Sequence, residues 1–249
     1  MVVNMGKTSF TGLAGAIDCV VEWPESEPRG WALVLHPHPL HGGARDNKIV
    51  TTIARACLQD GLVAVRPNFR GVGESAGEFD KAVGETADMR ELVRQFVQSH
   101  PEAAAGKWVL AGFSFGTSVA AQLYSILAEE KGALRGGDPA AATTVAASPG
   151  QGQDERAVPG EAALPDLLIL VGSAVERFRF REVVVPDDTL LVHGEADEVV
   201  PLAEAMDFAR ARGLPVVVVP EGSHFFHGKL IMLRRLVQER LAALWAGVH

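Results

Sequence analysis

A serine flanked by glycines is the side chain of this sequence best placed to act as a nucleophile. It is Ser114, in the run GFSFG (112–116), which follows an apolar segment and precedes a helical pattern. On a tight strand-to-helix turn a serine needs neighbours without a Cβ atom, and its hydroxyl is then exposed at the carboxyl end of a sheet. The helix directs its partial positive charge at the same point, which favours a developing oxyanion. This context predicts a catalytic serine; glycines that only permit close packing are the alternative.

An acid and a histidine later in the chain complete the expected chemistry, because a serine is a poor nucleophile until a base removes its proton. The partners of such a serine come in the order acid, then histidine, each just after a strand. Asp197 follows the apolar run TLLV, and His224 follows VVVV. We expect His224 to accept the Ser114 proton and Asp197 to orient and stabilise the imidazolium. We expect His193, still at a strand end, to be structural. Neighbours that compete for the two roles are Glu195, Glu198 and His227.

The run LHPHPLHGG (35–43) places three histidines close together and raises the question of a metal site. They are His36, His38 and His41. A catalytic metal needs three protein ligands and partners that orient them. The intervening prolines limit how far these side chains can converge, and a serine triad needs no metal. We therefore expect no metal and no other cofactor.

The place of this loop in the sequence favours a different role, the completion of an oxyanion hole. It follows the apolar run WALVL (31–35), and the loop after this strand supplies the second N–H of the hole, the first coming from Phe115. Pro37 and Pro39 have no N–H to donate. Leu40 follows the second proline and is the best candidate for the second donor.

Three further side chains are candidates to line the substrate site: His38, His41 and Phe113. A second loop, NFRGVGES (68–75), carries Arg70. We expect Arg70 to tie loops together by ion pairs, and the binding of a substrate carboxylate is the alternative.

Short apolar runs separated by amphipathic segments must position these residues. Six runs consist almost entirely of apolar residues, a pattern typical of strands that helices cover on both faces. They are 31–35, 62–66, 107–111, 167–171, 189–192 and 216–219. Four segments have apolar residues at helical spacing; they begin near Ile49, Met89, Val119 and Leu230. This alternation predicts a doubly wound, mostly parallel sheet with helices on both faces. The first thirty residues predict an antiparallel pair of strands before it.

Length and composition limit the class of protein. The 249 residues suit one domain, expected over 1–249, with a Gly/Ala/Pro-rich insertion at 132–165. The formal net charge of −8 argues against nucleic acid and anionic membranes as partners. No secretory signal or membrane-spanning run is visible, and the two cysteines, Cys19 and Cys57, lack metal-type spacing. We therefore expect a cytoplasmic protein; its oligomeric state is not indicated.

Several of these segments together resemble small bacterial α/β-hydrolases described as lidless serine esterases. The segments are LHPHPLHGGARDNKIV, RPNFRGVGESAGEFD, LAGFSFGTSVA, HGEADEVVP and VVVPEGSHFFHGKL, and the resemblance spans about 31–131 and 167–245. It implies an eight-stranded α/β-hydrolase core, a triad of Ser114, Asp197 and His224, and hydrolysis of carboxylic esters without a cofactor. The insertion at 132–165 departs from the pattern, because it precedes the strand after which caps usually occur.

The leading interpretation is a serine hydrolase that cleaves esters of small or soluble acyl groups through an acyl-enzyme. A thioesterase, amidase or peptidase with the same triad is the near alternative, since the triad does not determine which leaving group is cleaved. A non-catalytic binding protein on a hydrolase scaffold is the alternative from a different class. A metal-dependent hydrolase built on the histidine loop is a distant third.

Overall fold

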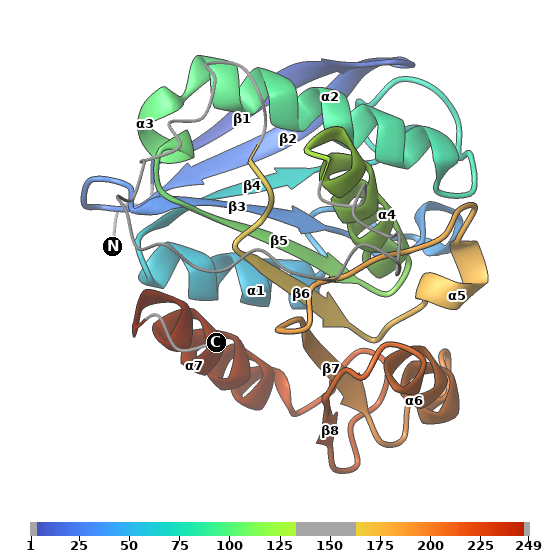
Figure 1. Ribbon diagram of the computed structural model, residues 1–249. Coiled ribbons are helices and arrows are strands. Elements are labelled where there is room, and N and C mark those ends of the chain that lie inside the picture. The colour runs from blue at the N-terminus through green and yellow to red at the C-terminus, as the bar shows by residue number, and fades with distance from the viewer. Residues whose placement is uncertain (1–3, 133–162, 247–249) are drawn as a thin grey trace, which may run out of the picture.

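A single mixed sheet forms the centre of the molecule. The structure, a computed structural model, describes residues 4–132 and 163–246. Within these residues eight strands occur in the order β1-β2-β4-β3-β5-β6-β7-β8 (Figure 1). They are β1 (Asn4–Gly12), β2 (Gly15–Trp23), β3 (Gly30–Leu35), β4 (Leu62–Pro67), β5 (Lys107–Phe113), β6 (Leu167–Val171), β7 (Leu190–Gly194) and β8 (Val216–Val219). Nearly all of the insertion expected at 132–165 lies outside the described residues.

The strand directions confirm a mostly parallel sheet with an antiparallel pair at its N-terminal edge. β2 pairs antiparallel with both β1 and β4, and every other neighbouring pair is parallel. β3 lies between β4 and β5, so the chain reverses its direction of travel across the sheet after β4. The carboxyl ends of β3, β5, β6, β7 and β8 consequently lie along one edge, where ligands bind in open α/β sheets.

Helices cover both faces of the sheet, as the alternating pattern predicts. α1 (Lys48–Gln59) and α7 (Leu230–Ala246) lie on one face, and α2 (Val83–Ser99) and α4 (Phe115–Glu130) lie on the other (Figure 1). The shorter elements are the 3₁₀ turn η1 (Pro39–His41), α3 (Pro101–Ala104), α5 (Val175–Phe178) and α6 (Leu202–Arg210). In the described residues, no helix has the length and apolar character needed to cross a membrane.

Two apolar cores explain why the central strands are apolar at every position. All residues of β3 and β6 are buried. Successive side chains of a strand point to opposite faces, so Leu33 packs in the core beneath α2 and α4, and Ala32 and Val34 pack in the core beneath α1 and α7. Trp31 stacks on Trp108 of the neighbouring strand, with 4.9 Å between ring centroids. This packing holds the strand ends, and the loops after them, in fixed positions.

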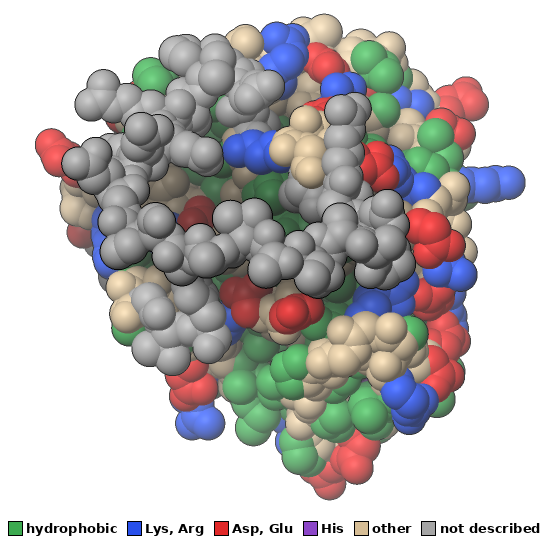
Figure 2. All heavy atoms as spheres, viewed as in Figure 1, with side chains coloured by type: hydrophobic (Ala, Val, Ile, Leu, Met, Phe, Trp, Pro, Cys, Tyr) green, Lys and Arg blue, Asp and Glu red, His purple; other side chains and the backbone are tan. Residues whose placement is uncertain are grey.

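The surface of the face shown in Figure 2 carries charges of both signs. Acidic and basic side chains are interspersed on its right-hand side, which is the side of α5 and α6 in Figure 1. Ion pairs join separate elements of the described structure, such as Arg90 of α2 with Glu130 of α4 and Arg177 of α5 with Glu204 of α6. Because side chains of both signs are mixed on the right-hand side of this face, it does not form a basic area.

Candidate active site

Ser114 lies at the turn between β5 and α4, where the sequence places it. Its backbone has φ 53° and ψ −119°, a conformation that residues with a side chain rarely adopt and that persists only where the surroundings enforce it. The glycines make the turn possible. A Cβ atom on Gly112 would lie 2.3 Å from the carbonyl oxygen of Gly116, and one on Gly116 would lie 2.5 Å from that of Leu35. The turn therefore requires the G-x-S-x-G pattern for steric reasons.

The three residues predicted to work together meet at the edge formed by the carboxyl ends of the strands. The Nε2 atom of His224 is 2.9 Å from Ser114 Oγ, and its Nδ1 atom is 2.8 Å from Asp197 Oδ2. All three residues are at least nine-tenths buried. With Nδ1–H donated to the carboxylate, Nε2 is left to accept the serine proton, which is the arrangement that general-base activation needs.

Backbone amides hold Asp197 as a carboxylate. Its Oδ1 atom accepts hydrogen bonds from the amides of Val199, at 2.9 Å, and Val200, at 2.7 Å. Burial alone would raise the pKa of Asp197, but the hydrogen bonds from His224 and these two amides outweigh burial and lower it. The turn that follows β7 thus supplies an ionised acceptor for the Nδ1–H of His224.

A second histidine, His193 at the end of β7, also contacts this carboxylate. Its Nε2 atom donates to the carbonyl oxygen of Val200 at 2.8 Å and lies 3.4 Å from Asp197 Oδ2. Its Nδ1 atom is buried without a partner in the described part of the chain. Burial lowers the pKa of His193, so the ring is neutral with its proton on Nε2. Its position within a strand was consistent with a structural role, and spacing gave no sign of the contact with Asp197.

The ionisable neighbours that compete for the acid and base roles point elsewhere. Glu198 accepts the backbone N–H of His224 at 3.1 Å, and Glu195 accepts that of Glu221 at 2.9 Å. His227 lies beside Ser223, 3.3 Å from its hydroxyl. None of the three contacts Ser114, so these side chains brace the two loops.

The loop after β3 is tied down by His36, which uses both ring nitrogens. Nδ1–H donates to the carbonyl oxygen of Pro37 at 2.7 Å, and Nε2 accepts the amide of Phe69 at 2.9 Å. Burial lowers the pKa of His36 to about 4, so the ring is neutral at physiological pH. His36 thereby joins the loop after β3 to the loop after β4.

A buried ion pair fixes the same loop farther along. Arg45 pairs with Asp18 of β2 at 2.5 Å, and Asn68 accepts the Arg45 amide while donating to Asp18. Arg70, for which a substrate role was the alternative, pairs with Asp88 of α2 at 2.8 Å and does not line the cavity around Ser114. The ion-pairing interpretation of Arg70 is therefore supported.

The loop amide expected to complete an oxyanion hole is engaged elsewhere. In η1 the amide of Leu40 donates to Nδ1 of His38 at 3.2 Å, and the Leu40 side chain is exposed and does not line the cavity. The structure does not support Leu40 as the donor. The reason is local: the residues around Pro39 form a turn that directs this N–H back onto the preceding histidine.

A cavity of about 470 Å³ opens above Ser114 and His224. His38 and His41 line it, as the sequence suggested. Phe113 does not; it is fully buried, and its ring packs against that of His224 with 5.0 Å between centroids. The walls that sequence analysis missed are Asn47, Ala174, Arg177, Phe178, Val199, Val200 and Phe225.

Two histidines of the loop after β3, His38 and His41, contact each other through their rings. Among the residues that the structure describes, no three His, Cys, Asp or Glu side chains converge as metal ligands would. The rings of His38 and His41 instead pack edge to face, with 4.6 Å between centroids. Burial, together with the neighbouring His41, lowers the pKa of His38.

Comparison with known proteins places the chain in a family. No family model matches it. It is 30% identical to a lidless α/β serine hydrolase from Xanthomonas campestris, over 96% of this chain and 94% of that one, with a TM-score of 0.73. It is 32% identical to an α/β serine hydrolase homologue from Coxiella burnetii, over 97% and 99%, with a TM-score of 0.71.

An uncharacterized protein from Rickettsia prowazekii is 39% identical over 119 residues. This match spans 48% of the chain and about half, 49%, of that curated relative. The two serine hydrolase structures, in contrast, are covered almost end to end and share the sheet and helices described above. The chain therefore belongs to the lidless α/β serine hydrolases.

Proposed function

We propose that this hydrolase cleaves carboxylic esters of small or soluble acyl groups through an acyl-enzyme on Ser114. The observation that carries the proposal is the continuous chain of hydrogen bonds from Ser114 through His224 to Asp197, with distances of 2.9 and 2.8 Å. The family membership supports hydrolysis, and the cavity above Ser114 supports a small-molecule substrate.

The proposed reaction has two halves that use the same three side chains. Ser114 Oγ attacks the ester carbonyl while His224 Nε2 takes the hydroxyl proton. When the tetrahedral intermediate collapses, the alcohol leaves with that proton and the acyl group stays on Ser114. A water molecule then attacks the acyl-enzyme, again with His224 as base, and releases the acid. Asp197 keeps the ring oriented and stabilises the imidazolium in both halves.

The oxyanion would be held by the Phe115 amide and by an amide of the loop after β3. Phe115 begins α4, where the first N–H groups of a helix have no intrahelical partner. In the loop we now favour the amide of His38. It has no hydrogen-bond partner in the described residues, and His38 lines the cavity with Ser114. The Leu40 amide would first have to leave His38 Nδ1.

The cavity walls support a preference for short acyl groups. Phe178, Phe225, Val199 and Val200 provide apolar contacts, but the whole cavity is only about 470 Å³. The element that follows β6 is α5, a single turn of four residues. A long acyl chain would extend out of this cavity and gain little further burial.

A panel of matched substrates tests the proposal. Nitrophenyl esters from acetate to dodecanoate, with the thioester and anilide of the preferred acid, are assayed with the wild type and with Ser114→Ala. We expect the highest kcat/KM for short esters, slower thioester and anilide cleavage, and loss of all three activities in the variant. A preference for long chains, or activity that persists in Ser114→Ala, would contradict the proposal. The cytoplasmic location stays a prediction from sequence alone.

A further inference from the structure

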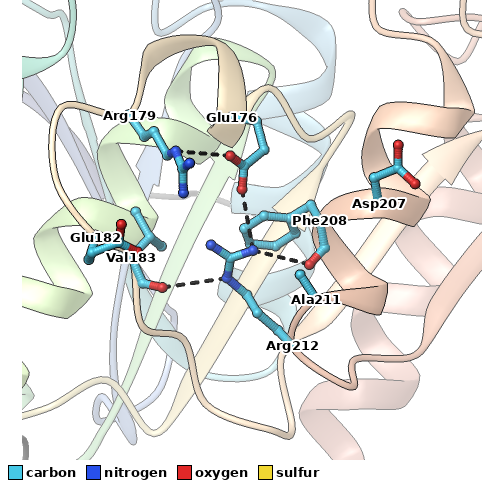
Figure 3. Close-up of a pocket in the computed structure, with 8 residues that line it drawn as sticks. All are labelled: Glu176, Arg179, Glu182, Val183, Asp207, Phe208, Ala211 and Arg212. Atoms are coloured by element: carbon cyan, nitrogen blue, oxygen red, sulfur yellow. Dashed lines mark hydrogen bonds and ion pairs between the residues drawn. The ribbon is translucent and has the colours of Figure 1, made fainter.

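The short helix α5 forms one wall of the catalytic cavity and is clamped to α6 from two sides. On the side shown in Figure 3, Arg212 reaches from the end of α6 to Glu176 of α5 at 3.3 Å and to the carbonyl oxygens of Phe208 and Val183. On the other side, Glu204 of α6 binds Arg177 of α5. The next residue of α5, Phe178, lines the cavity together with Arg177. This wall is therefore fixed in place before any substrate arrives.

The groove behind this wall, drawn in Figure 3, is bridged by ion pairs. Glu176 binds both Arg179 and Arg212, and the Arg212 guanidinium also lies over the ring of Phe208, 4.1 Å from its centroid. These contacts support α5 from behind the cavity wall.

Arg177 is the cation on the cavity side. Glu204 accepts from its Nε at 2.7 Å and from its Nη2 at 2.6 Å, a bidentate pair that fixes the plane of the guanidinium. Nη1 has no hydrogen-bond partner in the described part of the chain. The Arg177 side chain is 38% exposed, and Arg177 lines the same cavity as Ser114, whereas Glu204 does not line it. A guanidinium held by one edge in this way keeps its remaining donors free, and Arg177 borders the cavity.

A second donor faces the cavity from the loop after β3. Because Nδ1 of His38 accepts the Leu40 amide, the neutral His38 ring carries its proton on Nε2. The His38 ring packs against Phe178 with 5.2 Å between centroids, which places His38 next to the α5 wall. No Asp or Glu is among the described residues that line the cavity. The lining thus offers a cation and neutral donors, and the carboxylate that binds Arg177, that of Glu204, lies outside the lining.

Resting on the proposed function, we infer that the preferred substrates are esters that carry a second, free carboxylate, such as monoesters of small dicarboxylic acids. The carboxylate would bind the free edge of the Arg177 guanidinium, assisted by His38 Nε2–H, while Ser114 attacks the ester group. Arginine suits this role because its planar fork binds carboxylates and stays charged at every physiological pH. Arg177 is then a specificity-determining residue, and Glu204 positions it.

Matched substrates that differ only in charge test this inference. Monoethyl glutarate is compared with the ethyl ester in which a methyl ketone replaces the carboxylate. In a second pair the charge lies on the alcohol side of the ester. The acetate ester of a hydroxy acid of similar length is compared with the analogue in which a methyl ketone replaces the carboxylate. Release of the alcohol or acid is followed by NMR. We expect kcat/KM to favour the charged member of at least one pair by about tenfold or more, mainly through KM.

Three arginine variants distinguish recognition of the carboxylate from support of α5. Arg177→Met should remove the preference, lowering kcat/KM by about tenfold for the charged ester and by less than about twofold for its neutral analogue. Arg212→Met cuts the other clamp of α5 without touching the cavity, so it should change both members of a pair equally. Arg177→Lys should keep part of the preference, because the charge remains and the bidentate geometry is lost.

The outcomes distinguish the inference from the function on which it rests. The inference would be overturned if both members of each pair were hydrolysed at equal rates, or if Arg177→Met left the preference for the charged ester intact. Neither result would contradict the esterase proposal. A preference lost equally in Arg212→Met would also overturn the inference, because looser packing of α5 would then be the cause. Failure to hydrolyse any ester, charged or neutral, would count against the proposed function itself.

Discussion

Protonation of His36 is expected to destabilise the fold in acid, because both of its ring nitrogens are already committed. Nδ1–H donates to Pro37, and Nε2 accepts the amide of Phe69 at 2.9 Å. A proton added to Nε2 would face that N–H as a second donor, in a site with no exposed surface. The folded protein therefore resists protonation at a position that the unfolded chain protonates freely.

The size of this effect follows from the pKa of His36. Burial lowers it from 6.5 to about 4. As pH falls below about 6.5, the unfolded state binds a proton that the folded state excludes, so stability is lost until the folded ring also protonates near pH 4. This corresponds to about 3 kcal/mol over that interval. Carboxylates with lowered pKa, such as those of Asp18 and Asp197, lose their contributions at lower pH.

Urea unfolding from pH 7 to pH 4, followed by tryptophan fluorescence, measures the effect in the wild type, in His36→Gln and in His41→Gln. Glutamine can still accept the Phe69 amide but cannot titrate, and it loses the donor to Pro37. We expect His36→Gln to be less stable than the wild type by about 1 kcal/mol at pH 7, with the gap closing or reversing near pH 4. His41 is exposed, so its variant should follow the wild type. A stability difference between His36→Gln and the wild type that stays constant from pH 7 to pH 4 would show that protonation of His36 does not destabilise the fold.

Substitutions at two further positions, Asp197 and His193, probe the carboxylate of the site. In Asp197→Asn, the Val199 and Val200 amides hold the carbonyl oxygen, so the NH₂ group faces His224 and forces the ring proton onto Nε2. We expect kcat to fall by about ten-thousand-fold, and a loss below about tenfold would contradict the assigned roles. His193→Gln can carry a donor to the position of Nε2, whereas His193→Asn cannot; we expect about tenfold lower kcat in the Asn variant than in the Gln variant. Equal kcat values in these two variants would show that the contact of His193 with Asp197 does not matter.

The residues of the hydrogen-bonded chain could be predicted because each follows a strand in a fixed order. Ser114 requires glycine neighbours for steric reasons, and these are visible in the sequence. Asp197 and His224 follow β7 and β8, whose apolar runs mark the same sheet edge. The parallel sheet and the antiparallel N-terminal pair were predictable for a related reason, since strands buried on both faces must be apolar throughout.

The rest of the site depends on geometry that residue types do not determine. Leu40 follows a proline, yet the turn directs its N–H to His38. Phe113 precedes the serine on a strand, where alternation places its side chain in the core. α5 has only four residues, too few for a helical period, so nothing in the sequence placed Arg177 in the cavity wall. His193 lies in a buried strand, and its contact with Asp197 arises only when the turn after β7 folds back.

Covalent labelling of Ser114 tests the central claim most directly. The protein is treated with a fluorophosphonate, and the modified residue is located by mass spectrometry in the wild type, in Ser114→Ala and in His224→Ala. We expect one adduct on Ser114, formed in step with loss of ester hydrolysis. We also expect no adduct in Ser114→Ala and strongly slowed labelling in His224→Ala, because the base that activates the hydroxyl is gone. The assigned roles would be contradicted if Ser114 stayed unmodified in a protein that still hydrolyses esters, or if His224→Ala were labelled as fast as the wild type.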